Sequence, residues 1–464
     1  MPNIEAEQLK ELLKKDFEEC IAEVVQAIDT AKAGSIIDDS EEPVRAATGK
    51  LRQKIFQKAL QMKLDAAEAA FSPSRREKNK LRHKGIQSVS HGTVNGVVQL
   101  QRIYWRWPQK GRDDTIDRIV GIVADRVSTG VRQMCCRIGI SQQGFARGAE
   151  HLKHLAQLDI SRERLRQIVE SEGRLASQIQ QKWLLNVDFG VEDCKVRPDG
   201  LSRVYVGTDG VKVPMVTREE KNKRRKNRGK KRPCSKRRRM CKGADNTYKE
   251  FKIGTIYNES NEHRRVFATS GNHEVLGRLL RRLAGRLKIT EIDEKIGLAD
   301  GADWITKQFK IKLPMLDSRI LDFYHLSEHV WLVANICFGQ GNEQTGKFAS
   351  EVLHIAKHEG PMALLDRLME ERKKHGSKTK RKSLKELIQY IARRFEMCDY
   401  PQFIARGWQI GSGPTEAMCK VLTYRLKGAG MRWDRYAADA MMALLALQES
   451  NLWKSYWKLR KRVA

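Results

Sequence analysis

The stretch Arg203-Val204-Tyr205-Val206-Gly207-Thr208-Asp209-Gly210 joins a β-rich run to a turn-like motif that holds a carboxylate beside glycine. Two later motifs repeat this arrangement: Ala299-Asp300-Gly301-Ala302-Asp303 and Gly411-Ser412-Gly413-Pro414-Thr415-Glu416. The second motif follows another β-rich run, Lys295-Ile296-Gly297-Leu298, and the third opens a helical pattern. Each motif alone is typical of an ordinary turn or helix cap. Together they predict carboxylates that the fold gathers into one divalent-metal site.

The chain is strongly basic. Its 464 residues contain 88 Lys and Arg against 57 Asp and Glu, which gives a formal net charge of +31, and 40% of the residues are hydrophobic. The length predicts two to four domains, and the hydrophobic content is sufficient for globular cores. Such a charge surplus favours a polyanionic partner, with nucleic acid first and an anionic membrane second. A basic soluble or ribosome-associated protein is the plainer alternative.

Composition also excludes several classes. No run approaches the ~20 apolar residues needed to cross a bilayer, and Met1 to Glu19 lacks the pattern of a signal peptide. The nine cysteines include no Cys-x-x-Cys pair, so neither a disulfide framework nor a zinc ribbon is expected. We therefore expect a cytoplasmic protein with reduced thiols.

The N-terminal part is predicted to be mainly helical. The spacing of apolar residues predicts helices over 4–33 and about 44–70, separated by a polar break at residues 38–43. The stretch 88–107 changes to a strand period around Asn95-Gly96, which predicts a hairpin.

Two helix-like segments follow, at 141–156 and 161–172, with Ser161 as the expected N-cap of the second. Arg164, Arg166 and Gln167 share one face of that second helix. The pair forms either a helix-turn-helix that places its second helix against DNA or an ordinary helical hairpin. We expect the second helix to continue to about Trp183.

Residues 200–325 are predicted to form a mixed sheet covered by helices. The expected strands are 202–208, 250–257, 264–270, 295–299 and 318–323, with a helix at 273–287. From Leu326 onward the patterns are helical, at 326–338, 345–358, 360–373, 381–396 and 413–459, with a break at Gly428-Ala429-Gly430.

Residues 218–242 contain 15 Lys or Arg and two acids among 25 positions. A run so charged cannot bury a core, and it is predicted to be a mobile, solvated loop beside the first carboxylate. The loop either binds phosphates, with Arg224, Arg225, Arg237 and Arg238 as contacts, or only aids solubility.

Phosphodiester cleavage needs an activated oxygen nucleophile and stabilisation of the charge that develops on the attacking and leaving oxygens. Two Mg²⁺ ions about 3.5–4 Å apart supply both. Asp209, Asp300 and Glu416 are the expected ligands, and Mn²⁺ is expected to substitute for Mg²⁺. Their glycine neighbours are predicted to allow a close approach of the DNA backbone. Asp322, which also ends a predicted strand, competes with Asp300 for the second metal position.

The motifs resemble those of bacterial insertion-sequence transposases of the DDE class. The nearest branch is the ISKra-type group, which is related to Mutator-like transposases. The resemblance covers roughly 195–450 and rests on the three carboxylate motifs together with Leu321-Asp322-Phe323-Tyr324-His325-Leu326 and Arg425-Leu426-Lys427-Gly428-Ala429-Gly430-Met431-Arg432-Trp433. Relatives often carry a cysteine pair near the hairpin, and this chain has none there.

The resemblance implies roles for these residues. Asp209, Asp300 and Glu416 would form the catalytic triad. Asp322 and His325 match the Asp/Cys-x-x-His signature that follows the second aspartate in Mutator-like relatives, and both are expected to bind DNA. His325 would either touch a phosphate or close a strand-to-helix turn. Arg425, Lys427 and Arg432 are the expected phosphate contacts, with a solvated helix end as their alternative.

The resemblance also implies an α/β RNase H-like catalytic domain with an all-α insertion, preceded by a mainly helical DNA-binding region. The expected segments are an N-terminal helical region at 1–87, a hairpin with a helix-turn-helix-like region at 88–194, the catalytic domain at 195–330 and 409–464, and the insertion at 331–408.

The implied activity is Mg²⁺-dependent cleavage at the ends of an insertion element and strand transfer into target DNA. The partners would be the terminal inverted repeats, target DNA and further copies of the chain in a dimer or larger assembly on the bacterial nucleoid. The alternatives are an RNase H-like nuclease without strand transfer and a domesticated DNA-binding protein without activity. Paired-carboxylate glycosidase chemistry is more remote, because it has no use for a basic surface.

Overall fold

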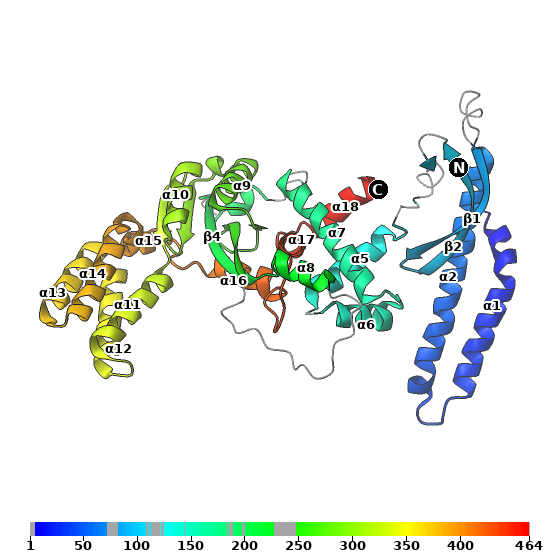
Figure 1. Ribbon diagram of the computed structural model, residues 1–464, viewed down its shortest axis with the longest axis horizontal. Coiled ribbons are helices and arrows are strands. Elements are labelled where there is room, and N and C mark those ends of the chain that lie inside the picture. Colours follow the sequence, from blue (N-terminus) through cyan, green and yellow to red (C-terminus); the bar gives the residue numbers. More distant parts are fainter. Residues whose placement is uncertain are drawn as a thin grey trace. The chain divides into compact units, whose positions relative to one another are not determined.

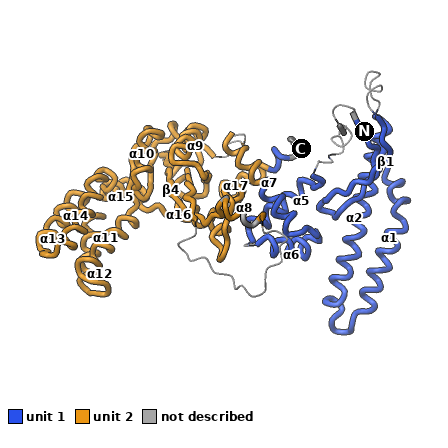
Figure 2. The backbone as a smooth tube through the Cα atoms, in the orientation of Figure 1, with its two compact units in different colours: residues 1–172, 457–464 blue, residues 173–456 orange. Residues whose placement is uncertain are grey.

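The computed structural model describes residues 5–71, 82–107, 111–112, 121, 125–142, 144–182, 185, 189–196, 200–226 and 247–463. The chain forms two compact units, shown in two colours in Figure 2. The first unit contains residues 1–172 and 457–464, and the second contains residues 173–456. The predicted division into four segments stays a prediction.

The first unit begins with two long antiparallel helices, α1 (Ala6–Asp29) and α2 (Ile36–Ala70), which lie side by side in Figure 1. The helix predicted over 4–33 is confirmed, but the polar break predicted at 38–43 is wrong, because these residues belong to α2. The side chain of Asp39 accepts hydrogen bonds from Ser35 Oγ at 2.7 Å and Lys32 N at 3.1 Å. Acidic side chains in a first turn favour a helix start, and α2 continues through Pro43.

The predicted hairpin is confirmed. Strands β1 (Arg82–Thr93) and β2 (Gly96–Trp107) pair antiparallel, and Thr93 lies opposite Gly96 at the turn. A two-residue strand, β3 (Gly111–Arg112), extends this sheet. The inward face of the hairpin, with Val98 and Leu100, packs on Leu64 of α2.

Three helices follow: α5 (Thr129–Ser141), α6 (Phe145–Ala156) and α7 (Arg162–Gln181). The helix predicted over 141–156 is wrong at its start, because Ser141 ends α5. Ser161 caps α7 as predicted, since its Oγ accepts a hydrogen bond from Arg164 N at 3.2 Å.

The arginines on the predicted DNA-binding face of α7 form hydrogen bonds and ion pairs within the protein. The Arg164 guanidinium donates to Asp125 O. Arg166 pairs with Glu163 at 2.6 Å and with Glu170 at 2.8 Å, and these bonds, the Glu163 bond first, raise its pKa. This pattern suits a packed helical hairpin, the alternative left open by the sequence, and DNA binding by α7 stays a prediction.

The second unit is built on a five-stranded mixed sheet in the order β6-β5-β4-β7-β8. The strands are β4 (Arg203–Pro214), β5 (Tyr248–Asn258), β6 (Arg264–Thr269), β7 (Glu294–Ala299) and β8 (Ser318–Leu321). Strands β4, β5 and β6 form an antiparallel meander, and β7 and β8 run parallel to β4. All five predicted strands are confirmed in position, although β4 runs six residues past the predicted end at 208.

Helices bury both faces of this sheet. Helices α9 (His273–Arg286) and α10 (Asp303–Lys312) pack with Val204, Val206 and Ile256 on one face. The other face, with Tyr205, Ile296 and Leu298, packs against the helical region that follows β8. The alternation of side chains along each strand separates the two cores.

The helical region after β8 confirms the predicted run of helices and is drawn in yellow and orange in Figure 1. It contains α11 (Phe323–Phe338), α12 (Glu343–His358), α13 (Pro361–Lys374), α14 (Lys378–Ala392) and α15 (Tyr400–Ala405). Each of α11 to α14 packs on the next, and α14 returns to α11. The chain ends with α16 (Gly413–Tyr424), α17 (Arg435–Glu449) and α18 (Trp453–Val463).

The basic segment begins with a helix, α8 (Arg218–Lys226), so the loop predicted over 218–242 is wrong for these residues. A capping box starts α8, because Thr217 Oγ1 accepts from Glu220 N and Glu220 Oε2 accepts from Thr217 N, both at 3.2 Å. Residues 227–242, with Arg237 and Arg238, lie outside the described residues. Among the helices that the structure describes, none is long and apolar enough to cross a membrane.

Candidate carboxylate site

Asp209 and Asp300 lie at the same level of the sheet. Strands β4 and β7 are parallel neighbours in which Gly207 lies opposite Leu298, and each aspartate comes two residues further along its segment. Side chains two residues apart point to the same face of a strand. Both carboxylates therefore lie toward the face that holds Tyr205 and Leu298. Asp209 is within β4 rather than at its end, because β4 continues to Pro214.

The third motif reaches this site through Gly207. Helix α16 packs on β4 and β5, and Thr415 Oγ1 hydrogen-bonds Thr255 Oγ1 at 2.9 Å. A Cβ at position 207 would collide with Thr415 Oγ1. Gly207 therefore gives the first turn of α16, which carries Glu416, room to approach the strand that carries Asp209.

The side chain of Cys419 connects the acids. It lies one helical turn after Glu416, and its thiol hydrogen-bonds the Asp209 carboxylate. Burial raises the pKa of the Cys419 thiol, the charges of Asp209 and Glu416 raise it further, and Lys427 opposes them. Cys419 was missed in the sequence, although its position three residues after Glu416 put it on the same side of a predicted helix.

Asp209 is half-buried and carries a perturbed carboxyl group. Burial is the main cause that raises its pKa, and the charges of Asp300 and Glu250 raise it further. Hydrogen bonds from Gly210 N and the Cys419 thiol act in the opposite direction. Among the described residues, no lysine, arginine or histidine forms an ion pair with Asp209 or Asp300. In the part of the chain that the structure describes, these two carboxylates therefore have no cationic side-chain partner.

The loop that carries Asp300 is held by Tyr390 of α14 and by Arg394, which follows the end of that helix. Tyr390 Oη donates to Asp300 O at 3.2 Å, and Arg394 Nε donates to Gly301 O at 2.7 Å. Arg394 Nη2 also pairs with Asp303 at 2.8 Å. These bonds fix the main chain and leave the Asp300 carboxylate with one bond, from Ala302 N at 2.9 Å. Tyr390 and Arg394 gave no motif in the sequence.

Asp322 has a structural role in this fold, and its predicted contact with DNA and its candidacy as a metal ligand stay predictions. It is 1% exposed. Its Oδ1 caps α11 by accepting from Tyr324 N at 2.8 Å, and its Oδ2 accepts from Ser412 N at 3.2 Å and from Ser412 Oγ. Asp322 thereby ties the end of β8 to the loop that opens α16.

Two of the predicted phosphate-binding cations are also used inside the protein. Arg425 is 2% exposed and lies over the Trp433 ring, and burial lowers its pKa to about 10. Arg432 makes bonds of 2.5 and 2.7 Å to Glu220 and donates to Met215 O. Arg432 thereby holds the loop before α17 against Met215 and α8, and the predicted phosphate contacts of both arginines stay predictions.

The remaining predicted cations stay predictions. Lys427 is exposed and lies near enough to Cys419 to lower the pKa of its thiol. Arg225 is exposed on α8, and the side chain of Arg224 lies outside the described residues, as do Arg237 and Arg238.

His325 lies in the first turn of α11 and is half-buried. Its Nδ1 is 3.4 Å from Glu328, and its ring meets that of His329 edge-on at 4.9 Å. His329 in turn packs on Tyr390 at 4.4 Å. These contacts fit a residue that packs the turn after β8, and the predicted contact with DNA stays a prediction.

Several glycines of the motifs allow close packing within the protein, and the predicted approach of the DNA backbone stays a prediction. Gly207 receives Thr415, Gly210 lies against the Glu250 carboxylate, and Gly301 lies against Leu321 and Arg394. Gly301 also has a φ of +75°, which favours glycine. Around Gly413 there is open space.

Glu416 lies in the first turn of α16, close enough to Cys419 for its charge to raise the pKa of that thiol. It is exposed, and its Oε2 is 3.8 Å from Lys420 Nζ. Among the described residues, no three His, Cys, Asp or Glu side chains are grouped so that they could hold a metal ion. The structure therefore brings two carboxylates together, with the third one helical turn away from Cys419.

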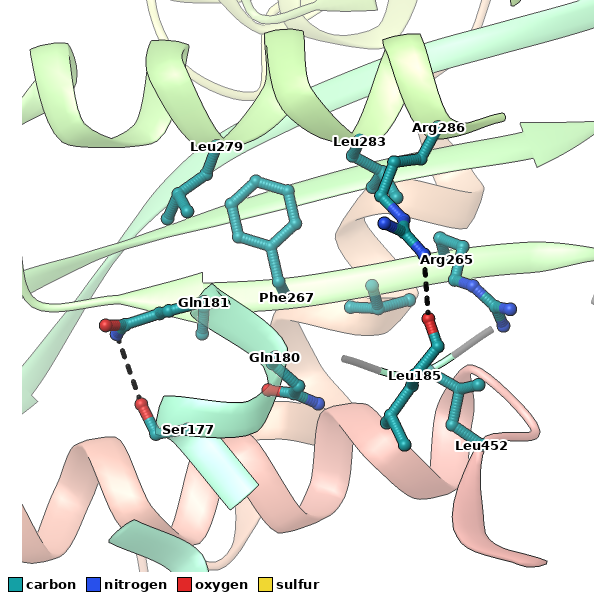
Figure 3. Close-up of a pocket in the computed structure, with 12 residues that line it drawn as sticks. Ser177, Gln180, Gln181, Leu185, Arg265, Phe267, Leu279, Leu283, Arg286 and Leu452 are labelled. Carbon is teal, nitrogen blue, oxygen red and sulfur yellow. Dashed lines mark hydrogen bonds between the residues drawn. The ribbon is translucent and has the colours of Figure 1, made fainter. Parts of the chain in front are cut away.

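A cavity of about 60 Å³ lies elsewhere in the second unit, between β6, α9 and the end of α7 (Figure 3). Phe267, Leu279, Leu283 and Leu452 give it a mainly apolar lining. Arg286 Nη2 donates to Leu185 O at 3.3 Å beside it. The described residues that line this cavity include no Asp or Glu, so it has no part in the carboxylate site.

No family model matches the chain, and no curated protein matches it. Among solved structures, the chain is similar to the Drosophila P element transposase strand transfer complex, with 12% sequence identity and a TM-score of 0.27. The match covers 72% of this chain and 81% of that one. At this identity and TM-score the similarity carries no argument, and function is argued from the geometry of the site.

Proposed function

We propose that the chain is a DDE transposase of the ISKra-type branch, which cleaves DNA at the ends of an insertion element and transfers the strands into target DNA. The observation that carries the proposal is the Asp209 carboxylate. It lies beside Asp300 and receives the Cys419 thiol from the helix that presents Glu416. This arrangement supports a common role for three motifs that span about two hundred residues of the chain.

The sheet supports an RNase H-like catalytic fold. Its antiparallel meander β4-β5-β6 is followed by the parallel strands β7 and β8, with helices on both faces. In open α/β sheets, ligands bind outside the carboxyl ends of parallel strands. Asp300 lies at this edge, beside Asp209 on β4. The net charge of +31 supports a polyanionic substrate.

Asp209 and Asp300 offer two of the oxygen ligands that a divalent cation prefers, while the described residues include no group of three such ligands. Asp209 and Asp300 are both half-buried, and burial first and then the charge of Asp300 raise the pKa of Asp209. Oxygen ligands of this kind suit Mg²⁺ and Mn²⁺. Asp209, Asp300 and Glu416 would hold the metal, which when bound supplies activation of the nucleophile and stabilisation of the charged leaving oxygen. Tyr390 and Arg394 keep the Asp300 loop in place, and Asp322 holds the start of α16 through Ser412.

The proposal is tested with Asp209→Asn and Asp300→Asn in the full chain. Each variant keeps the size of the side chain and removes its charge. We expect Mg²⁺-dependent cleavage of DNA that carries the element's terminal repeats to fall at least about a thousandfold, which corresponds to about 4 kcal/mol of transition-state stabilisation. DNA binding, measured by fluorescence anisotropy at fixed ionic strength, is expected to remain within about threefold of the unmutated chain.

Asp366→Asn is the matched control, because this aspartate is exposed on α13, away from the site. It is expected to cleave like the unmutated chain. Full cleavage by Asp209→Asn would overturn the assignment, and unchanged function of both aspartate variants in cells would favour a DNA-binding protein without activity. Joined target products distinguish a transposase from a nuclease of the same fold.

A further inference from the structure

Helix α1 has an apolar stripe that no part of the described chain covers. Phe17, Ile21, Val25 and Ile28 are 39%, 63%, 51% and 47% exposed. Their spacing of four, four and three residues places them on one side of the helix. Helix α1 packs on α2 through a different side, which carries the buried residues Leu13 and Cys20. An apolar row of this kind on a long exposed helix marks an interaction surface.

The charges around the stripe are arranged with opposite signs at its two ends. Lys14 lies on the N-terminal side and Asp29 on the C-terminal side, and both are exposed. Among the described residues, neither side chain forms an ion pair with the rest of the chain. The other side of α1 is anchored by pairs that Lys54 and Lys50 of α2 form with Asp16 and Glu23, at 2.6 and 3.1 Å.

We propose that the stripe binds the same stripe of a second copy of this chain, in antiparallel orientation. A two-fold axis at Ile21 places Ile21 of one copy against Ile21 of the other and Phe17 against Val25. The same axis places Lys14 of each copy opposite Ile28 and next to Asp29 of the second copy, so two ion pairs close the ends of the interface. In a parallel pair, Lys14 would face Lys14 and Asp29 would face Asp29, and like charges would oppose association.

The spacing supports this arrangement. A helix rises about 1.5 Å per residue, so Lys14 and Asp29 are about 22 Å apart along α1. The four apolar side chains fill the length between them. The pattern of an apolar seam flanked by charges that select orientation is the one that defines antiparallel helix pairs. The interface is self-complementary, as a two-fold dimer requires.

The first test measures the molar mass of the full chain by sedimentation velocity over a concentration series. The unmutated chain is expected to be a dimer that dissociates on dilution. The double variant Ile21→Asp with Val25→Asp is expected to raise the dimer dissociation constant about a hundredfold. Leu12→Asp is the matched control, because Leu12 is 50% exposed but lies on the opposite side of α1 from Ile21. It is expected to leave the dimer intact.

The second test substitutes exposed charged residues of α1. These substitutions are expected to leave the packing of α1 on α2 unchanged. Lys14→Asp and Asp29→Lys alone are each expected to raise the dissociation constant about tenfold, and the combined variant is expected to restore it. Far-ultraviolet circular dichroism checks that the helices persist. A chain that is monomeric at every concentration would overturn the proposal. So would a dimer that tolerates the double variant at Ile21 and Val25, loses stability equally with Leu12→Asp, or is not restored by the charge exchange.

Discussion

The ends of β7 and β8 carry the same residue at equivalent positions, with opposite consequences. The two strands are parallel neighbours in which Ala299 lies opposite Leu321, and an aspartate follows each of them. Asp322 is buried, and both of its oxygens accept hydrogen bonds from the first turn of α11 and from Ser412. Asp300 is half-buried; Tyr390 binds its main-chain oxygen, and its carboxylate accepts a hydrogen bond from Ala302 N of its own loop.

This difference shows how to separate a structural acid from a functional one. The protein satisfies the carboxylate of Asp322 and so uses it to join three segments. It holds the loop of Asp300 from outside, through Tyr390 and Arg394, and leaves the carboxylate beside that of Asp209. Two carboxylates that are held in place but lack a cationic partner are costly without a ligand. The cost is accounted for if the ligand is a divalent cation.

The largest effect on stability is expected at Asp322. Asp322→Ala removes the cap of α11 and leaves Ser412 without its buried acceptor, so the free energy of unfolding is expected to fall by about 2–4 kcal/mol. Urea unfolding followed by tryptophan fluorescence measures this loss. Asp434→Ala is the control, because Asp434 caps α17 in a more exposed position through Tyr436 N. It is expected to cost about 1 kcal/mol. Equal losses in the two variants would show that the bond to Ser412 contributes nothing.

Much of the second unit could be predicted from its sequence, because strong local patterns and tertiary packing agree there. The strand at 295–299 and the helix at 273–287 were found almost residue by residue. The start of α2 was not, because Pro43 and the acids before it resemble a break, while Asp39 in fact supports the helix start. The helix α8 was missed because the density of charge hid the capping box of Thr217 and Glu220.

The carboxylate site was likewise predictable only in part. Sequence motifs gave the acids Asp209 and Asp300, whose proximity follows from strand register. They could not show that Asp322 is buried, because burial depends on Ser412, 90 residues later in the chain. Nor could they show that Arg425 and Arg432 are internal, because a basic residue beside glycines has the same local pattern in a phosphate-binding loop and in a packed one. The partner of each arginine, Trp433 or Glu220, is fixed only by the tertiary fold.

The Asp300 loop offers an intermediate effect, on catalysis rather than on stability. Arg394→Gln removes the bond to Gly301 O and the pair with Asp303, so the loop is expected to lose its fixed position. We expect the cleavage rate at saturating DNA to fall about tenfold and the Mg²⁺ concentration for half-maximal rate to rise, while DNA affinity stays the same. Arg393→Gln, at the exposed neighbouring position, is the control and is expected to have no effect. A loss of stability without a change in Mg²⁺ dependence would show that Arg394 only supports the fold.

The smallest effect is expected from the charge of Asp209 itself, in the absence of DNA. Because burial raises its pKa in the folded state above the ordinary value of 3.8, the folded chain binds this proton more tightly than the unfolded chain. The stability that this proton provides is complete below the ordinary pKa and is lost as pH rises through the folded-state value. Asp209→Asn lacks this loss, so its melting temperature relative to the unmutated chain is expected to increase as pH rises from acid to neutral.

A bound divalent cation should reverse that difference at neutral pH. At ten times its dissociation constant, Mg²⁺ is expected to stabilise the unmutated chain by about 1.4 kcal/mol, or about 2–4 °C in melting temperature. Asp209→Asn is expected to lose most of this shift, because one of the paired carboxylates no longer carries charge. Differential scanning fluorimetry with Mg²⁺ and with NaCl at matched ionic strength separates specific binding from screening. An equal Mg²⁺-dependent rise in melting temperature in the two chains would show that Asp209 does not bind the cation. The Asp209–Asp300 pair would then be stabilised by contacts within the protein, as Asp322 is.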